Sequence, residues 1–166
     1  MLKVLQNKKL ALLGVLILGA VLYYPALFND YVWDDIIIFV DRDFWREGHS
    51  IWYMISQPVL EGTSYFRPLV FLTFVAEFQL FGLKPFVSHA VNLLFLLINT
   101  ALLYFLTAKL AQRINKKNPL IYALLASLLY VTSPILVEST AWAVGRFDLM
   151  VTTFILLGSY VYIAYE

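Results

Sequence analysis

The sequence predicts an all-α membrane protein with four transmembrane helices and with juxtamembrane helices in a large first outer loop. Hydrophobic residues make up 61% of the chain and charged residues 14%, whereas soluble domains average about 45–50% and about 25%. The mean hydropathy is +0.77, and the apolar residues gather in runs long enough to cross a bilayer. The net charge of +1 gives no basic excess for binding nucleic acid. The absence of cysteine excludes disulfides and thiolate metal sites.

The first transmembrane helix is predicted over residues 10–28. A bilayer core of about 30 Å needs about 20 helical residues, and this run has that length. Lys3, Lys8 and Lys9 precede it, and basic residues before an apolar run are also typical of a signal peptide. The run is long for a signal peptide, however, and it ends in Tyr-Tyr-Pro and not in a small-residue cleavage site. We therefore expect an uncleaved helix.

Residues 29–85 are predicted to form the large outer loop, with a juxtamembrane helix over residues 66–83. This helical run barely reaches across a bilayer, and a crossing would bury Glu77 at a cost of roughly a few kcal/mol or more. Thr73, Glu77 and Lys84 fall on one helical stripe by their spacings of four and seven. The pattern indicates a helix that lies at the membrane interface with one polar stripe.

The rest of the chain alternates between apolar runs and short connections, and Ser133-Pro134 interrupts the third apolar run near its end. Because basic residues are expected after the last helix and the chain instead stops at Glu166, we expect an N-terminal or truncated portion of a longer protein. The predicted elements are a second transmembrane helix over 86–108, a cytoplasmic loop over 109–119, a third transmembrane helix over 120–137, an outer loop over 138–146 and a fourth transmembrane helix over 147–165.

The basic residues predict the orientation in the membrane, because lysine and arginine accumulate in cytoplasmic loops. The N-terminal lysines and the basic cluster within residues 109–117 lie on the same side only if the 66–83 helix does not cross. We therefore expect a multi-pass protein of the lipid bilayer with a cytoplasmic N-terminus. The first large loop then lies on the outer face, which is periplasmic, extracellular or lumenal.

An adjacent acid pair, Asp34 and Asp35, follows the first predicted helix. Two neighbouring carboxylates repel, which tends to raise one of the two pKa values, and desolvation near a membrane acts in the same direction. Such a carboxylate can act as a general base toward a hydroxyl. The alternative is a solvated acidic loop, in which an aspartate caps a short helix or turn.

Arg67 precedes Pro68 at the start of the predicted juxtamembrane helix. Proline suits the first helical turn, and a helix N-terminus beside an arginine is a natural anion site. At a membrane face the expected anion is a lipid phosphate. The alternative is an interfacial arginine that pairs with lipid headgroups or with loop aspartates.

Two further groups of polar residues lie in or beside the predicted transmembrane helices. His89, Asn92 and Asn99 share one face of the second helix, where they are expected to bond neighbouring helices or to line a cleft. Ionisable groups near a membrane are functional candidates. The alternative for the ionisable residues of the second outer segment is that they fix helix packing through a Glu138–Arg146 or Asp148–Arg67 pair. The second outer segment carries Glu138, Arg146 and Asp148.

The order of these elements resembles a known family. The motifs "NDYVWDD", "YFRPLVFLTF", "FGLKPFVSHAVNLL" and "SPILVESTAWAVGRFDLM" follow one another around the predicted helices. This order resembles the N-terminal part of GT-C type membrane glycosyltransferases, nearest to the transmembrane-and-tetratricopeptide-repeat O-mannosyltransferases and their bacterial relatives. Protein O-mannosyltransferases and aminoarabinose transferases are more distantly similar. The resemblance covers nearly all of the chain.

The resemblance implies an inverting transfer of a sugar, mannosyl or another hexosyl, from a polyprenyl-phosphate donor to an acceptor hydroxyl on the outer face. It implies that Asp34, or Asp35 in second place, is the base, and that Arg67 binds the donor phosphate. The second outer segment would line the same cleft. The acceptor would be a protein serine or threonine, a lipid or a glycan.

Two other classes of function remain open at this stage. The chain could be a small non-catalytic membrane protein that acts as an assembly or binding partner, or a transporter or lipid-handling module. A catalytic site requires Asp34, Arg67 and either Glu138 or Asp148 to converge on one outer cleft. The sequence specifies no cofactor, and a divalent metal is compatible with it.

Overall fold

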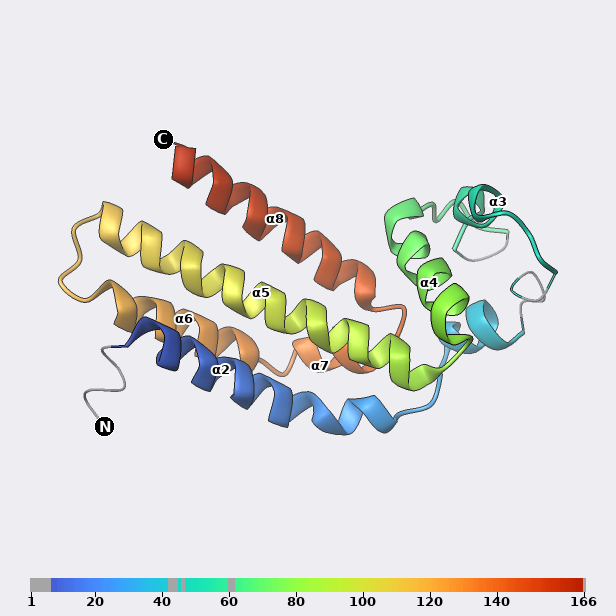
Figure 1. Cartoon of the computed structure of the whole chain (residues 1–166), viewed down its shortest axis with the longest axis horizontal. Coiled ribbons are helices and arrows are strands. Elements are labelled where there is room, and N and C mark those ends of the chain that lie inside the picture. Colours follow the sequence, from blue (N-terminus) through green and yellow to red (C-terminus); the bar gives the residue numbers. More distant parts are fainter. Residues whose placement is uncertain (1–6, 42–44, 46, 60–61, 166) are drawn as a thin grey trace.

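The computed structural model describes residues 7–41, 45, 47–59 and 62–165, and these residues form helices and connections without a strand. Lys3 of the predicted basic N-terminus lies outside this part of the chain. Helices α2, α5, α6 and α8 run side by side as an elongated bundle, and a smaller lobe that contains α3 and α4 lies at one end (Figure 1). Three helical segments in the described chain are long and apolar enough to cross a membrane: Lys8–Phe28, Pro85–Arg113 and Arg146–Tyr165.

The first segment consists of α2 (Lys8–Tyr23) and a 3-10 turn, η1 (Tyr24–Phe28). It contains the whole predicted range 10–28. The Asn7 side chain caps α2 by accepting hydrogen bonds from the Lys9 and Leu10 N–H groups, at 3.1 and 3.4 Å. Pro25 lies in the first turn of η1, where its missing N–H is not needed.

Gly19 marks the closest approach of α2 to its neighbours. A Cβ atom at this position would lie 2.6 Å from Val131 Cγ2 and 3.1 Å from Leu97 Cδ2. We expect Gly19→Ala to destabilise the bundle by about 1–3 kcal/mol, because the packed interface must move to admit a methyl group. Gly14 in the same helix has open space at its Cβ position, so Gly14→Ala is the matched control and should be neutral or slightly stabilising. Unfolding of both variants in detergent measures the difference, and equal midpoints would contradict this packing.

Helix α5 (Pro85–Arg113) is the central element of the bundle, with α8 on one side and α2 and α6 on the other (Figure 1). At about 1.5 Å per residue it is roughly 43 Å long. The predicted range was 86–108, and the helix continues for five residues beyond it. Three of the extra residues, Lys109, Gln112 and Arg113, are polar. The helix ends shortly before Asn115, which has a left-handed conformation (φ 55°).

The third predicted transmembrane helix, 120–137, differs from the structure. Helix α6 (Pro119–Val131) has 13 residues, the chain then turns at Thr132–Ile135, and a second short helix, α7 (Leu136–Ala141), follows. Pro134 lies in this turn. The helix is interrupted there because proline has no N–H group with which to continue the hydrogen-bond ladder. Together, α6 and α7 return the chain from the end where α5 finishes to the end where α8 (Arg146–Tyr165) begins (Figure 1).

The lobe contains a short π-helical turn, η2 (Ile36–Val40), with α3 (Ile51–Ser56) and α4 (Pro68–Phe81). Helix α4 has 14 residues, or about 21 Å, which is shorter than a bilayer core of about 30 Å. Its buried face belongs to an aromatic-rich core; Phe74 and Phe71 pack there with Trp45 and Phe39. This core continues to Ala143, Val144 and Met150, so the lobe is fixed to the start of α8.

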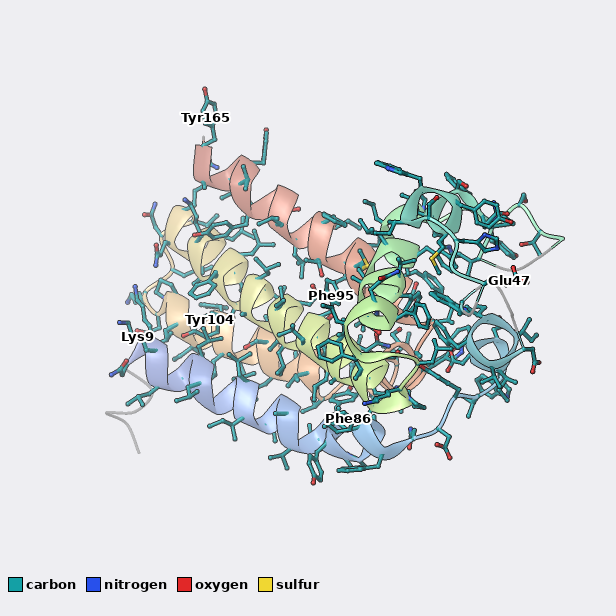
Figure 2. The ribbon with its side chains drawn as sticks, turned by 45° about the vertical axis from the view of Figure 1, so that its right-hand side comes forward. Lys9, Glu47, Phe86, Phe95, Tyr104 and Tyr165 are labelled. Carbon is teal, nitrogen blue, oxygen red and sulfur yellow. The ribbon has the colours of Figure 1, made fainter. Side chains whose placement is uncertain are left out.

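The two ends of the bundle differ in character. The Tyr104 hydroxyl of α5 donates to the Lys8 carbonyl of α2 at 3.1 Å, which places the start of α2 beside the last turns of α5. Figure 2 shows Lys9 and Tyr104 at the end remote from Glu47 of the lobe. The basic residues that flank α2 and α5 therefore gather at one end, and the acidic lobe occupies the other.

Candidate functional site

The acid pair opens the lobe, and its two members have different surroundings. Asp35 is fully buried. Its carboxylate accepts hydrogen bonds from the N–H groups of Val144 (2.9 Å), Ala143 (3.2 Å) and Val32 (3.3 Å). Burial raises the pKa of Asp35, the three N–H donors oppose that shift, and the charge of Asp34 adds to it. Asp35 therefore ties the loop after η1 to the turn between α7 and α8.

Asp34 is half-buried, and in the described chain its carboxylate has no hydrogen-bond or ion-pair partner. The preceding residue, Trp33, has a left-handed backbone (φ 51°) and is 72% exposed. Bulky residues seldom adopt this conformation, which costs free energy and is common at functional sites. The Trp33 ring packs edge-on against Trp142 with centroids 6.2 Å apart. The Asp34 carboxylate is thus the one member of the pair left open to a ligand.

An open cavity, or groove, of about 530 Å³ is lined by Val32 and Trp33, which precede the acid pair in the sequence, whereas Asp34 and Asp35 are not among its lining residues. It is walled by Trp33 and Trp142, and Glu138 of α7 supplies a carboxylate. The indole nitrogen of Trp142 is buried and has no hydrogen-bond partner in the described chain. A second cavity of about 430 Å³, between α2, η1, α6 and α7, shares Asn29 and Pro134 with the first. The two cavities are neighbours, and both have mainly apolar walls.

Arg146 lies on the opposite side of the α7–α8 turn and is fully buried. It forms an ion pair with Glu77 of α4 and donates to the Thr73 hydroxyl at 2.8 Å. Its other nitrogens donate to the Asn92 side-chain oxygen at 2.8 Å and to the Ser88 carbonyl at 2.9 Å. The guanidinium therefore joins α4, α5 and α8 at one point.

This network corrects two expectations. An interfacial helix would turn its polar stripe to water, but Thr73 and Glu77 face Arg146 and Glu77 is only 8% exposed. Lys84 does not belong to this stripe, because α4 ends at Phe81. The partner of Arg146 is Glu77 and not Glu138, which is exposed on α7. A buried arginine requires a buried partner. The feature of the sequence that could have identified this partner is Glu77, an acidic residue within an otherwise apolar helix.

Arg67 directly precedes α4 and is half-buried. Its guanidinium lies over the Phe147 ring at 3.8 Å and near the Tyr65 ring at 5.5 Å. It has no ion-pair partner in the described residues, and the proposed Asp148–Arg67 pair does not form. Stacking on an aromatic face holds the guanidinium in place while its N–H donors stay available.

The first turn of α8 sends three consecutive side chains in three directions. Arg146 points inward to Glu77, Phe147 supports Arg67, and Asp148 is exposed and accepts from the Ser139 hydroxyl at 3.4 Å. The turn before it is tight, because a Cβ atom on Gly145 would lie 2.9 Å from Ser139 Cα. The structure thus brings Arg67, Arg146 and Asp148 to one helix start.

The polar face of α5 is used for packing. Asn92 donates to the carbonyls of Trp142 (2.9 Å) and Ala143 (3.2 Å), and Asn99 donates to the Leu149 carbonyl at 2.8 Å. His89 is fully buried, and neither ring nitrogen forms a hydrogen bond of normal geometry in the described chain. No group of three or more histidine and carboxylate side chains in the described residues could hold a metal ion.

The convergence of Asp34, Arg67 and either Glu138 or Asp148 on one cleft, which was expected of a catalytic site, is not seen in the described residues. These residues separate instead into two surfaces joined by the α7–α8 turn. One surface is the groove beside Asp34, with Glu138 in its wall. The other is the start of α8 with Arg67 on Phe147. Asp35 connects them, because it binds the N–H groups of the turn from which Arg146 follows. Sequence reasoning had not identified Glu77, Thr73 or Ser88 as the groups that hold Arg146.

No family model matches the chain, and no solved structure matches it. Curated proteins do. Protein O-mannosyl-transferase TMTC1 of Homo sapiens is 31% identical over 143 residues, which cover 81% of this chain and 16% of that protein. Protein O-mannosyl-transferase TMTC3 of Homo sapiens is 29% identical over 150 residues, which cover 85% of this chain and 16% of that protein.

The corresponding mouse proteins match at 29% and 27% identity. The chain spans about 16% of the length of the human relatives it matches. Its apolar helices and these relatives together identify an integral membrane protein. Over about four-fifths of its length, the chain is a distant homologue of the protein O-mannosyl-transferases TMTC1 and TMTC3.

Proposed function

We propose that this chain is a module of an integral-membrane glycosyltransferase that moves a sugar from a polyprenyl-phosphate donor to an acceptor hydroxyl. The observation that carries the proposal is the similarity to two protein O-mannosyl-transferases over 81–85% of the chain. The names of these relatives favour mannose as the sugar and a protein as the acceptor. The transfer takes place with inversion on the outer or lumenal face.

The base in this proposal is Asp34. A general base needs an unoccupied lone pair within hydrogen-bond reach of the acceptor hydroxyl. Asp35 already accepts three backbone N–H groups and is sealed from solvent, whereas the Asp34 carboxylate is half-buried and unpaired in the described chain. Asp35 is accordingly a positioning residue, which holds the loop that carries Asp34.

The groove beside Asp34 suits the acceptor better than the donor. Its lining residues include a carboxylate, two tryptophans and no cation. A phosphate there would face Glu138 without compensation, whereas a neutral chain could lie against the indole rings. We therefore assign the acceptor to this groove.

The donor phosphate is assigned to Arg67. The guanidinium has no carboxylate partner in the described part of the chain, and Phe147 orients it. A planar guanidinium matches two phosphate oxygens at once, and it would stabilise the charge that develops on the leaving lipid phosphate. Arg146 cannot take this role, because its donors are already used by α4 and α5.

The orientation in the proposal follows from the two ends of the bundle. The basic end is cytoplasmic, because lysine and arginine are retained on that side. The lobe and the α7–α8 turn then lie on the outer face. Helices α5 and α8 run in the same direction (Figure 1). In this proposal the α6–α7 segment therefore returns the chain and is the third of four crossings in chain order.

The role of Arg67 can be tested with a donor titration. In a transfer assay with polyprenyl-phosphate mannose and an acceptor peptide, Arg67→Gln should raise the KM for the donor by about 10- to 100-fold. Loss of a charge-assisted hydrogen bond is worth about 1.5–3 kcal/mol. Arg67→Lys keeps the charge but loses the planar guanidinium, so its donor KM should lie between those of the wild type and Arg67→Gln. An unchanged donor KM in Arg67→Gln would remove Arg67 from the donor site.

The second candidate is a non-catalytic membrane protein that serves as an assembly or binding partner. The observation that favours it is that Arg146, Glu77 and Asn92 satisfy one another inside the bundle, as packing groups do. The assay above separates the two, because an assembly partner shows no transfer, and its Arg67 and Asp34 variants change only complex formation.

A further inference from the structure

The end of the bundle remote from the acid pair contains a basic cavity of about 360 Å³ between α2, α5, α6 and α8. This volume is within the range of small-molecule sites, about 300–1,000 Å³. Lys8 comes from the first turn of α2, and Lys109 and Gln112 come from the last turns of α5. The aromatic part of the wall is made by Tyr104, Phe105 and Tyr160.

The two lysines of this cavity carry uncompensated charge. Lys109 is half-buried, and its Nζ lies 5.6 Å from the centroid of the Tyr160 ring on α8. Neither Lys8 nor Lys109 has a carboxylate partner in the described residues. Residues 7–28, 86–137 and 149–165 contain no aspartate or glutamate at all. The described residues of the four helices contain one carboxylate, Asp148, which lies in the first turn of α8, whereas the cavity is lined by Tyr160 near the other end of that helix. The cavity therefore offers an anion two cations without a carboxylate in its wall.

The surroundings of the cavity are apolar on the outer side of the bundle. Leu110, which follows Lys109, is 40% exposed, and Leu10 and Phe105, which lie within one helical turn of Lys8 and Lys109, are each 47% exposed. Tyrosines beside lysines at the ends of apolar helices are typical of the level of the lipid headgroups. A free inorganic anion would need the lysines alone, whereas a phospholipid uses the lysines and the apolar wall.

We propose that this cavity binds the headgroup of an anionic phospholipid. The phosphate lies between Lys8 and Lys109, and the acyl chains follow the exposed apolar side chains of α2 and α5. A bound lipid would link the start of α2 to the ends of α5 and α8, because Lys109 also contacts Tyr160. Basic cavities between membrane helices on the cytoplasmic side recognise such headgroups. The site is separate from the proposed transfer site and does not depend on it.

The test is the thermal unfolding of the full chain in detergent micelles titrated with phosphatidylglycerol, with phosphatidylcholine or with inorganic phosphate. Phosphatidylglycerol should raise the unfolding midpoint with a saturable dose dependence, and the other two should not. The double variant Lys8→Gln/Lys109→Gln should bind phosphatidylglycerol about thirtyfold more weakly. Lys8→Arg/Lys109→Arg keeps both charges and should retain binding.

The matched control is Lys116→Gln/Lys117→Gln, which removes the same charge from the α5–α6 loop outside this cavity. It should keep most of the phosphatidylglycerol effect. Equal losses in the two double glutamine variants would overturn the site in favour of diffuse surface charge. An equal shift with inorganic phosphate would overturn the lipid as occupant, and no shift with phosphatidylglycerol would overturn the proposal. If Lys8→Gln/Lys109→Gln does not fold, single Lys8→Gln must still weaken binding.

Discussion

Arg146→Met is expected to lower the free energy of unfolding by about 3–5 kcal/mol, because it leaves Glu77 buried without its cation. Glu77 is 8% exposed, and besides Arg146 it has only the Ser88 hydroxyl, at 3.0 Å, as a side-chain partner in the described residues. The same substitution also removes the donors to Thr73, Asn92 and the Ser88 carbonyl. The contacts that hold α4 against α5 and α8 should therefore be lost together.

The measurement is unfolding in mixed detergent micelles, followed by tryptophan fluorescence and helix content. The double variant Glu77→Gln/Arg146→Met should recover part of the loss, since replacing both members of a buried pair avoids an unpaired charge. Lys117→Met, on the exposed α5–α6 loop, removes a cation without a buried partner and should change stability by less than about 0.5 kcal/mol. If Arg146→Met unfolds within about 1 kcal/mol of the wild type, Arg146 is not the tie between these helices.

The helices that cross most of the bundle could be predicted from the sequence, because their signal is local. Each of the segments 10–28, 86–108 and 147–165 is a predominantly apolar run, and each corresponds to a long helix. The third predicted run failed in part for an equally local reason. Ser133-Pro134 marks a break, and α6 stops at Val131, before the proline.

The direction in which a charged side chain points could not be predicted, because it depends on distant partners. The spacing of polar residues predicts that Glu77 belongs to the polar stripe of an interfacial helix. In the structure Glu77 instead binds Arg146, which is 69 positions further along the chain. The same holds for the acid pair. Asp34 and Asp35 are equivalent in the sequence, and the N–H groups that capture Asp35 belong to Ala143 and Val144.

The sequence therefore identified candidate residues for the site but did not predict how they are arranged in space. Arg67, Glu138 and Asp148 all lie at or near the α7–α8 turn, but Arg67 stacks on Phe147 while Glu138 lines the groove. The tight turn at Gly145 lies between Glu138 of α7 and the first turn of α8. No pattern in the sequence specifies such a turn without the coordinates of its neighbours.

Asp34→Asn is expected to reduce kcat for sugar transfer by about 10²- to 10⁴-fold, because the acceptor hydroxyl loses its general base. Asparagine has nearly the same shape as aspartate but does not accept a proton at neutral pH. The donor KM should stay near its wild-type value, since Arg67 and not Asp34 is assigned to the phosphate. Asp35→Asn should instead act through stability, because the lost acceptor leaves N–H groups of the α7–α8 turn buried and unpaired.

The central claim is tested most directly by one comparison of transfer rates. The full-length protein that contains this chain is assayed with a polyprenyl-phosphate mannose donor and an acceptor peptide, as wild type, as Asp34→Asn and as Asp41→Asn. Asp41 lies in the same loop and is exposed, so its variant makes the same chemical change away from the groove. The account predicts a loss of at least about 100-fold for Asp34→Asn and wild-type transfer for Asp41→Asn. Equal transfer by the wild type and Asp34→Asn would contradict it.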